Sequence, residues 1–182
     1  MRYAQQALHC KGNAFVTDKV SVSADIRNYL QLNEIEYEEI AGPTFVVTLP
    51  GVKKLKTNVA LRVGTHAVSI SGFVARCPEE NADKVHAWLL EKNRRMYGVA
   101  FSIDQYGDIY LTGRVALRAI DDHELDRLLG SVLEYADESF NPILELGFLS
   151  AMQREWDWRI SRGEPTFNLE AWRHLLEHPS EQ

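Results

Sequence analysis

The clearest pattern of hydrophobic and polar positions lies between residues 99 and 111. Every second residue from Val99 to Ile103 is hydrophobic, which is the period of a β-strand with one buried face. The loop at residues 105–107 ends in glycine, which suits the left-handed position of a three-residue hairpin turn. Such a turn brings the hydrophobic residues of both strands onto one face. The predicted register pairs Phe101 with Leu111 and Ile103 with Ile109.

Alternating hydrophobic residues at 59–63 and 68–70 predict a second hairpin. Gly64 and Thr65 fit a two-residue turn with glycine in the first position. The register that follows from this turn pairs Leu61 with Val68 and Val59 with Ile70. Residues 37–40 and 44–49, on either side of a turn with Gly and Pro, predict two further strands.

Hydrophobic residues three or four positions apart predict helices around these strands. Each predicted helix starts at a residue that caps or initiates helices: Ser23, Pro78, Asp121, Asn141 and Asn168. Pro142 is expected to break or kink the long third helix, with Asn141 capping the new start. The C-terminal hydrophobic stripe is predicted to run through Met152, Trp156 and Ile160 to Gly163.

The predicted element order is α-β-β-β-β-α-β-β-α followed by a helical C-terminus. Two hairpins require an antiparallel sheet, so the fold class is α+β, with helices packed on a sheet built from hairpins. The chain divides into an N-terminal arm at residues 1–20, a main domain at 21–148 and a helical C-terminal extension at 149–182. Residues 1–20 show no clear periodicity, and both an ordered arm and a loose tail stay open.

Composition narrows the class of protein. The chain has 182 residues, 45% of them hydrophobic, and a net charge of −6. Binding of nucleic acid or of an anionic membrane is not favoured at this charge. No hydrophobic run approaches membrane-spanning length, and residues 1–11 lack the hydrophobic core expected of a signal peptide. The two cysteines, Cys10 and Cys77, are expected to be free thiols in a reducing cytoplasm rather than a disulfide.

Charge is unevenly placed along the chain. Residues 41–78 contain five basic residues and no acid, whereas residues 121–149 contain eight acids and only Arg127. We favour solvated faces on separate elements as the explanation. Complementarity between the two segments, or a basic patch for an acidic partner, is the alternative.

No residue set carries a catalytic, cofactor-binding or metal-binding signature. Asp104 and Asp108 flank a turn and are typical of turn residues. His174 and His178 lie four apart but lack a third ligand, and Cys77 has no partner base. Phosphate-binding loops, nucleophile elbows, HExxH and CxxC motifs are all absent. We therefore predict a protein that is not an enzyme and uses no metal or cofactor.

Several short motifs together resemble the YbjN family, bacterial proteins with a type III secretion chaperone-like fold. The matching motifs lie at residues 54–57, 61–64, 88–90, 97–101, 107–111, 126–130 and 140–142. The resemblance spans residues 37–148 and implies a chaperone-like fold without a catalytic site. It also implies a cytoplasmic, dimeric protein that acts by binding other proteins, loosely described as a regulator in signal transduction.

The leading hypothesis is a cytoplasmic adaptor or chaperone-like regulator that forms a homodimer and binds an unidentified client protein. The alternative is a small-ligand sensor or an enzyme with a pocket between the sheet and the helices. The sheet face opposite the predicted core carries small residues, aromatic residues and arginines, which favours coverage by a helix, a second subunit or a client. The candidate partner or dimer surface consists of Arg62, Ser71, Phe73, Tyr110, Arg114, Trp156 and Trp158.

Overall fold

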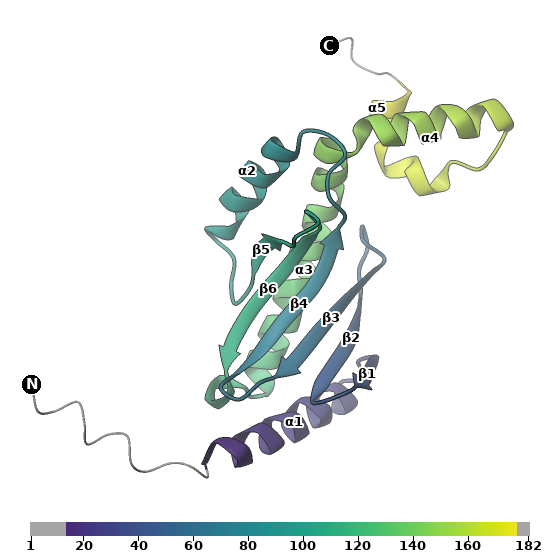
Figure 1. The fold of residues 1–182 in the computed structure, drawn as a ribbon. Coiled ribbons are helices and arrows are strands. Elements are labelled where there is room, and N and C mark those ends of the chain that lie inside the picture. Colours follow the sequence, from purple (N-terminus) through teal and green to yellow (C-terminus); the bar gives the residue numbers. More distant parts are fainter. Residues whose placement is uncertain (1–13, 178–182) are drawn as a thin grey trace, which may run out of the picture.

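The alternating segments of the chain form a six-stranded antiparallel sheet in the computed structural model, which describes residues 14–177 (Figure 1). The strands are β1 (Tyr37–Ile40), β2 (Thr44–Pro50), β3 (Lys56–Val63), β4 (Ala67–Ala75), β5 (Ala100–Ile103) and β6 (Ile109–Ala116). Their order across the sheet is β1-β2-β3-β4-β6-β5. The predicted α+β fold class with an antiparallel sheet is confirmed.

The β5–β6 hairpin has the predicted register. Phe101 lies opposite Leu111. Gly107 has φ +83°, the left-handed conformation that glycine adopts without steric cost. The Asp104 N–H donates to the Asp108 carbonyl at 3.0 Å, which closes the loop. The turn chemistry was therefore sufficient to predict this hairpin.

The β3–β4 hairpin has a different register from the predicted one. Leu61 pairs with Ile70 rather than Val68, because four residues instead of two separate the last paired residues of the hairpin, Val63 and Val68. The Gly64 N–H donates to the Ala67 carbonyl at 2.9 Å and closes this longer turn. Since the error amounts to two residues, each side chain still points to the predicted face of the sheet.

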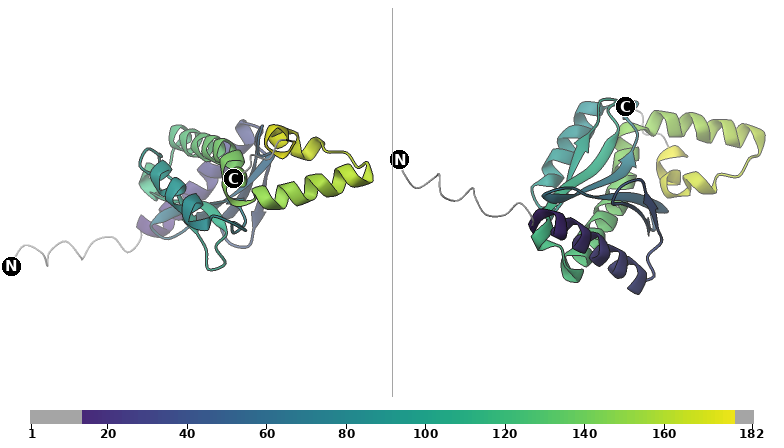
Figure 2. Two further views of the ribbon diagram at one scale, coloured as in Figure 1. Left: turned by 90° about the horizontal axis from the view of Figure 1, so that it is seen from above. Right: turned by 60° about the horizontal axis from the view of Figure 1, so that its bottom comes forward.

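Besides the sheet, residues 14–177 form five α-helices and two short 3₁₀ helices. The α-helices are α1 (Ala14–Leu32), α2 (Ala82–Asn93), α3 (Asp122–Gly147), α4 (Leu149–Arg162) and α5 (Arg173–Leu176), and the 3₁₀ helices are η1 (Leu117–Ala119) and η2 (Phe167–Trp172). Helix α3 runs behind the sheet in Figure 1, and α1 lies across its lower end. Figure 2 shows that α4 projects away from the sheet.

Three predicted helix starts are wrong. Ser23 lies inside α1, where its hydroxyl donates to the Lys19 carbonyl at 2.8 Å, so the predicted arm boundary at residue 20 falls within this helix. Pro78 precedes α2 by four residues, because Asn81 has the left-handed φ of 50° just before the helix. Asn168 lies inside η2 and caps no helix.

The predicted start of α3 is confirmed, but its predicted break is wrong. The Asp121 carboxylate accepts the Glu124 N–H at 2.8 Å, as an N-cap does. Helix α3 continues through Pro142 to Gly147, so Asn141 does not cap a new start. Residues on both sides of the proline are buried on the same stripe, and this tertiary packing outweighs the single hydrogen bond that the proline removes.

The main core lies between α3 and one face of the sheet. The buried residues of α3 meet hydrophobic side chains from β2, β3, β4 and β6, and α1 closes one end of the core. A smaller core joins α4, η2 and α5 to the last turns of α3: Met152, Trp156, Leu169, Trp172 and Leu176, with Phe140 and Leu144 packed against them. Ile160, predicted on the buried stripe of α4, is exposed.

We expect Leu61→Ala to lower the free energy of unfolding by about 2–5 kcal/mol, because truncating a fully buried leucine leaves a cavity. Leu61 is 1% exposed in the middle of the main core. Chemical denaturation followed by circular dichroism measures the change. The matched control is Leu55→Ala, since Leu55 is 77% exposed. Equal denaturation midpoints for the two variants would show that the strand faces are assigned incorrectly.

Candidate functional site

The sheet face opposite the core is open in the described chain. Helices α3 and α1 contact the sheet only on its hydrophobic face, as the alternation of buried and half-exposed residues along β2, β3 and β4 shows. A helix, a second subunit or a client segment was expected to cover the second face. No helix within residues 14–177 covers it.

The open face brings five of the seven predicted surface residues together. Arg62 on β3 and Arg114 on β6 lie on either side of Ser69 on β4, and Thr44 on β2 extends this row beyond Arg62. The next row starts with Glu38 on the edge strand β1 and continues with small or β-branched side chains: Val46, Ala60, Ser71, Thr112 and Ala100. The strand register therefore places a row with two arginines beside a row of mostly short, uncharged side chains, which we call the low row.

An aromatic pair borders the low row on its other side. Phe73 and Tyr110 lie opposite each other on β4 and β6, with their rings edge to face at a centroid distance of 5.5 Å. The ammonium of Lys54 lies 5.4 Å from the Phe73 ring centre. Burial lowers the pKa of Lys54 below its usual range. These contacts hold the aromatic pair in place at one end of the open face.

The two predicted tryptophans do not join this face. Trp156 is buried in the small C-terminal core, so it is not available as a surface residue in this chain. Trp158 lies two residues further along α4 and therefore points away from that core, where Arg162 stacks on it at 5.3 Å. Periodicity could have separated the two, since Met152 and Trp156 share the four-residue spacing of the buried stripe.

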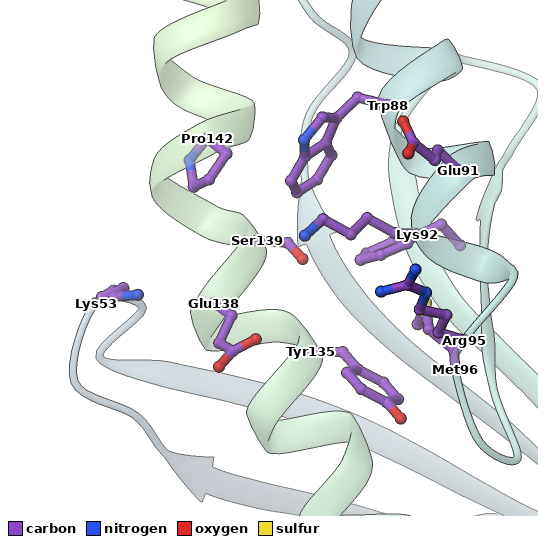
Figure 3. A pocket seen from close by; sticks show the side chains of 11 residues that line it. Lys53, Trp88, Glu91, Lys92, Arg95, Met96, Tyr135, Glu138, Ser139 and Pro142 are labelled. Carbon is purple, nitrogen blue, oxygen red and sulfur yellow. The ribbon is translucent and has the colours of Figure 1, made fainter.

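A pocket of about 550 Å³ lies between α2 and α3, outside the open face (Figure 3). Helix α2 contributes Trp88 and Lys92 to its lining, the turn after α2 contributes Arg95, and α3 contributes Tyr135 and Ser139. Lys92 points from α2 towards α3, with its ammonium 4.9 Å from the centre of the Trp88 ring. The sequence predicts such a pocket only in general terms, because the residues that line it come from segments far apart in the chain.

The rim of this pocket is completed by Lys53 from the β2–β3 loop. One oxygen of the Asp137 carboxylate on α3 accepts the N–H groups of Val52, Lys53 and Lys54 at 2.8, 2.8 and 2.9 Å. The basic loop is thus bound to the acidic helix by backbone hydrogen bonds. These hydrogen bonds use backbone N–H groups, and none of the ion pairs within residues 14–177 joins the basic segment to the acidic one.

The side chains considered for catalysis have structural roles. The Asp104 carboxylate accepts the N–H groups of Tyr106 and Asp108 within the hairpin loop, and Asp108 accepts the Cys77 N–H at 2.8 Å. Cys77 is a free, exposed thiol. Cys10 and His178 lie outside the described residues. Within residues 14–177, no group of three or more His, Cys, Asp or Glu side chains could hold a metal ion.

Comparison with known proteins identifies the family. A family model named YbjN, with the description "Putative bacterial sensory transduction regulator", matches residues 23–145. The chain belongs to the YbjN family. The YbjN-family protein is 49% identical over 160 residues to Uncharacterized protein Rv0487 of Mycobacterium tuberculosis, a match that covers 85% of this chain and 87% of the relative. It is 47% identical over 157 residues to Uncharacterized protein ML2442 of Mycobacterium leprae, covering 84% and 85%.

Solved structures share the fold at low sequence identity. A chain in "Structure of the HopA1-SchA Chaperone-Effector Complex" aligns with a TM-score of 0.51 and 10% identity, covering 66% of the YbjN-family protein and 93% of that chain. A chain in "Crystal Structure of the ExsC-ExsE Complex" gives 0.51 and 11%, with coverage of 68% and 93%. The predicted type III secretion chaperone-like fold is confirmed. In the part of the YbjN-family protein described here, no helix has the length and hydrophobicity to cross a bilayer.

We expect Asp137→Ala in this YbjN-family protein to lower the free energy of unfolding by about 1–3 kcal/mol, because three N–H groups lose a charged acceptor. Amide hydrogen exchange at Val52, Lys53 and Lys54 should become faster. The matched control is Glu134→Ala, one helical turn away on the exposed side of α3, which should change stability by no more than about 0.5 kcal/mol. Unchanged exchange at the three amides would contradict the anchoring role.

Proposed function

We propose that this YbjN-family protein is a non-enzymatic, cytoplasmic adaptor or chaperone-like regulator that binds a partner protein through the open sheet face. The observation that carries the proposal is the uncovered face itself. A sheet face that is exposed to solvent usually carries long charged residues at alternate positions. The open face instead carries a row of mostly small residues between the arginines and the aromatic pair. Tyr and Arg are enriched where partners bind.

The side chains on the open face support a partner segment that is extended and carries acidic groups. The small residues of the central row allow another backbone to approach the sheet closely. Arg62 and Arg114 are exposed and form no ion pair within residues 14–177, so both guanidinium groups are available for carboxylates of a partner. The titles of the similar structures name a chaperone–effector complex and a two-protein complex, which agrees with a binding role.

The domain boundaries form part of the same proposal. The family model ends at residue 145, close to the point where α3 ends and α4 begins. Residues 149–177 contribute most of a separate small core. We therefore place a chaperone-like domain up to residue 148 and a helical extension after it. The extension exposes Trp158, Ile160 and Phe167, which makes it a second candidate for contact between protein chains.

We expect Tyr110→Asp and Ser71→Trp to abolish the recovery of specific partner proteins in affinity purification from the native cell with quantitative mass spectrometry. The first change places a charge in the aromatic pair, and the second puts bulk in the low row. Matched controls are Tyr106→Asp and Ser21→Trp at exposed positions away from this face. If the partner set of both face variants equals that of the wild type, the open face is not the binding surface.

We also expect the protein to be a homodimer, as the chaperone-like fold and the exposed hydrophobic residues of the extension suggest. Light scattering coupled to size exclusion at micromolar concentration should give twice the 20.8 kDa mass of the chain. Trp158→Ser then tests whether the extension contributes, since loss of this exposed ring should weaken the dimer without unfolding the chain. A single species at the mass of one chain would contradict the prediction.

A further inference from the structure

One wall of the pocket between α2 and α3 carries a serine hydroxyl that has no hydrogen-bond partner among the described residues. Ser139 is 5% exposed, and its side chain lines the pocket. Its hydroxyl makes no hydrogen bond to any residue that the structure describes, unlike the helical serines Ser23 and Ser161, which donate to carbonyls of their own helices. In Figure 3 the hydroxyl points from α3 into the space facing α2. The hydroxyl oxygen is open to the pocket, so it is available as a hydrogen-bonding group to water or to a bound molecule.

Five charged side chains line the same pocket without forming ion pairs with one another. Lys53, Lys92 and Arg95 line it together with Glu91 and Glu138, and none of the five forms an ion pair within residues 14–177. Their formal sum is +1, whereas the whole chain carries −6. Lys92 lies in the last turn of α2 and Arg95 in the turn that follows the helix, and both cations face Ser139 across the pocket.

The aromatic lining and the volume of the pocket suit a planar organic ligand. Trp88, Phe101 and Tyr135 contribute three aromatic side chains. The hydroxyl oxygen of Tyr135 accepts the Tyr97 N–H at 3.0 Å, which leaves its own O–H available as a donor. A volume of about 550 Å³ lies in the range of small-molecule sites, which combine apolar walls with a few polar groups.

Pro142 adds an acceptor on the α3 side. It lines the pocket and has no N–H, so the carbonyl of Glu138 lacks its usual helical donor four residues later. The Glu138 side chain lies on the same wall. The cationic donors, Lys92 and Arg95, thus come from the end of α2 and the turn after it, and the acceptors come from Glu138 on α3.

We propose that the α2–α3 pocket binds a small aromatic organic acid. Its carboxylate or phosphate lies between Lys92, Arg95 and the Ser139 hydroxyl, and its ring packs against Trp88 and Tyr135. The proposal is independent of the open sheet face, because no residue of that face lines the pocket. It gives this family a ligand-binding site in addition to a protein-binding surface.

The test uses three acids as probes, indole-3-acetate, 4-hydroxybenzoate and phenyl phosphate, titrated into the full-length protein and followed by ¹H–¹⁵N NMR. At least one should bind saturably and shift the signals of residues around Ser139. Indole-3-acetamide, the neutral counterpart of indole-3-acetate, should bind at least about ten-fold more weakly than its acid, the equivalent of about 1.4 kcal/mol. Raising the salt concentration should weaken binding of indole-3-acetate but not that of indole-3-acetamide.

Arg95→Gln and Ser139→Ala should each weaken binding about ten-fold, since each removes a hydrogen bond to a charged group. Arg94→Gln is the matched control, because Arg94 is the adjacent residue and does not line the pocket. Tyr110→Asp on the open face should leave binding unchanged, so failure of the adaptor proposal and failure of this one are distinguishable. Denaturation midpoints of all variants confirm that each is folded.

Three results would overturn the proposal. The first is the absence of saturable binding by all three acids up to millimolar concentration. The second is equal affinity for the acid and its amide, or equal loss in Arg94→Gln and Arg95→Gln. The third is binding of an acidic aromatic peptide, acetyl-Asp-Phe-Glu-amide, through Arg95 and Ser139 while the small acids do not bind, which would make the pocket a peptide site.

Discussion

Burial of one sheet face against α3 is the interaction on which the rest of the structure depends. The stripe that runs from Leu125 to Ile143 covers hydrophobic residues of four strands, and each fully buried aliphatic side chain contributes about 1.5–3 kcal/mol. This burial keeps α3 continuous through Pro142, although the residue type favours a break. It also leaves the second face of the sheet without a helix, because α3 is the longest helix within residues 14–177 and its buried stripe already packs on the first face.

The same helix positions every other functional element. Asp137 holds the β2–β3 loop, and the Gly147 carbonyl accepts the N–H groups of Glu79 and Glu80 ahead of α2. Gly147 has no room for a side chain, since a Cβ would lie 2.9 Å from Pro78. Glu80 in turn accepts the N–H and hydroxyl of Ser150 at the start of α4, and these hydrogen bonds lower the pKa of Glu80. Loop, pocket wall and C-terminal extension are therefore all fixed relative to α3.

The two candidate sites meet at strand β5. The side chain of Phe101 lines the pocket, and Asn93 at the end of α2 exchanges two hydrogen bonds with the Phe101 backbone, at 2.7 and 3.2 Å. Its neighbour Ser102 pairs with Tyr110 of the open face. The Asn93 amide also occupies backbone groups on the outer edge of β5, which protects that edge from pairing with another strand. The pocket and the open face thus share one short strand while using different side chains.

Local chemistry in the sequence was enough to determine the strands, their faces, the β5–β6 register and the Asp121 cap, because each depends on residues a few positions apart. The β3–β4 turn could not be predicted in the same way, since Gly64 and Thr65 fit two loop lengths that leave the buried faces identical. Ser23 and Asn168 lie inside helices, so residue type alone did not mark a helix start there. Pro78 acts in a context set by a distant segment, since the Gly147 carbonyl accepts the N–H groups of the two residues that follow it. The pocket was decided only by the tertiary structure, because packing of α2 and the turn after it beside α3 brings Arg95 and Ser139 to one cavity.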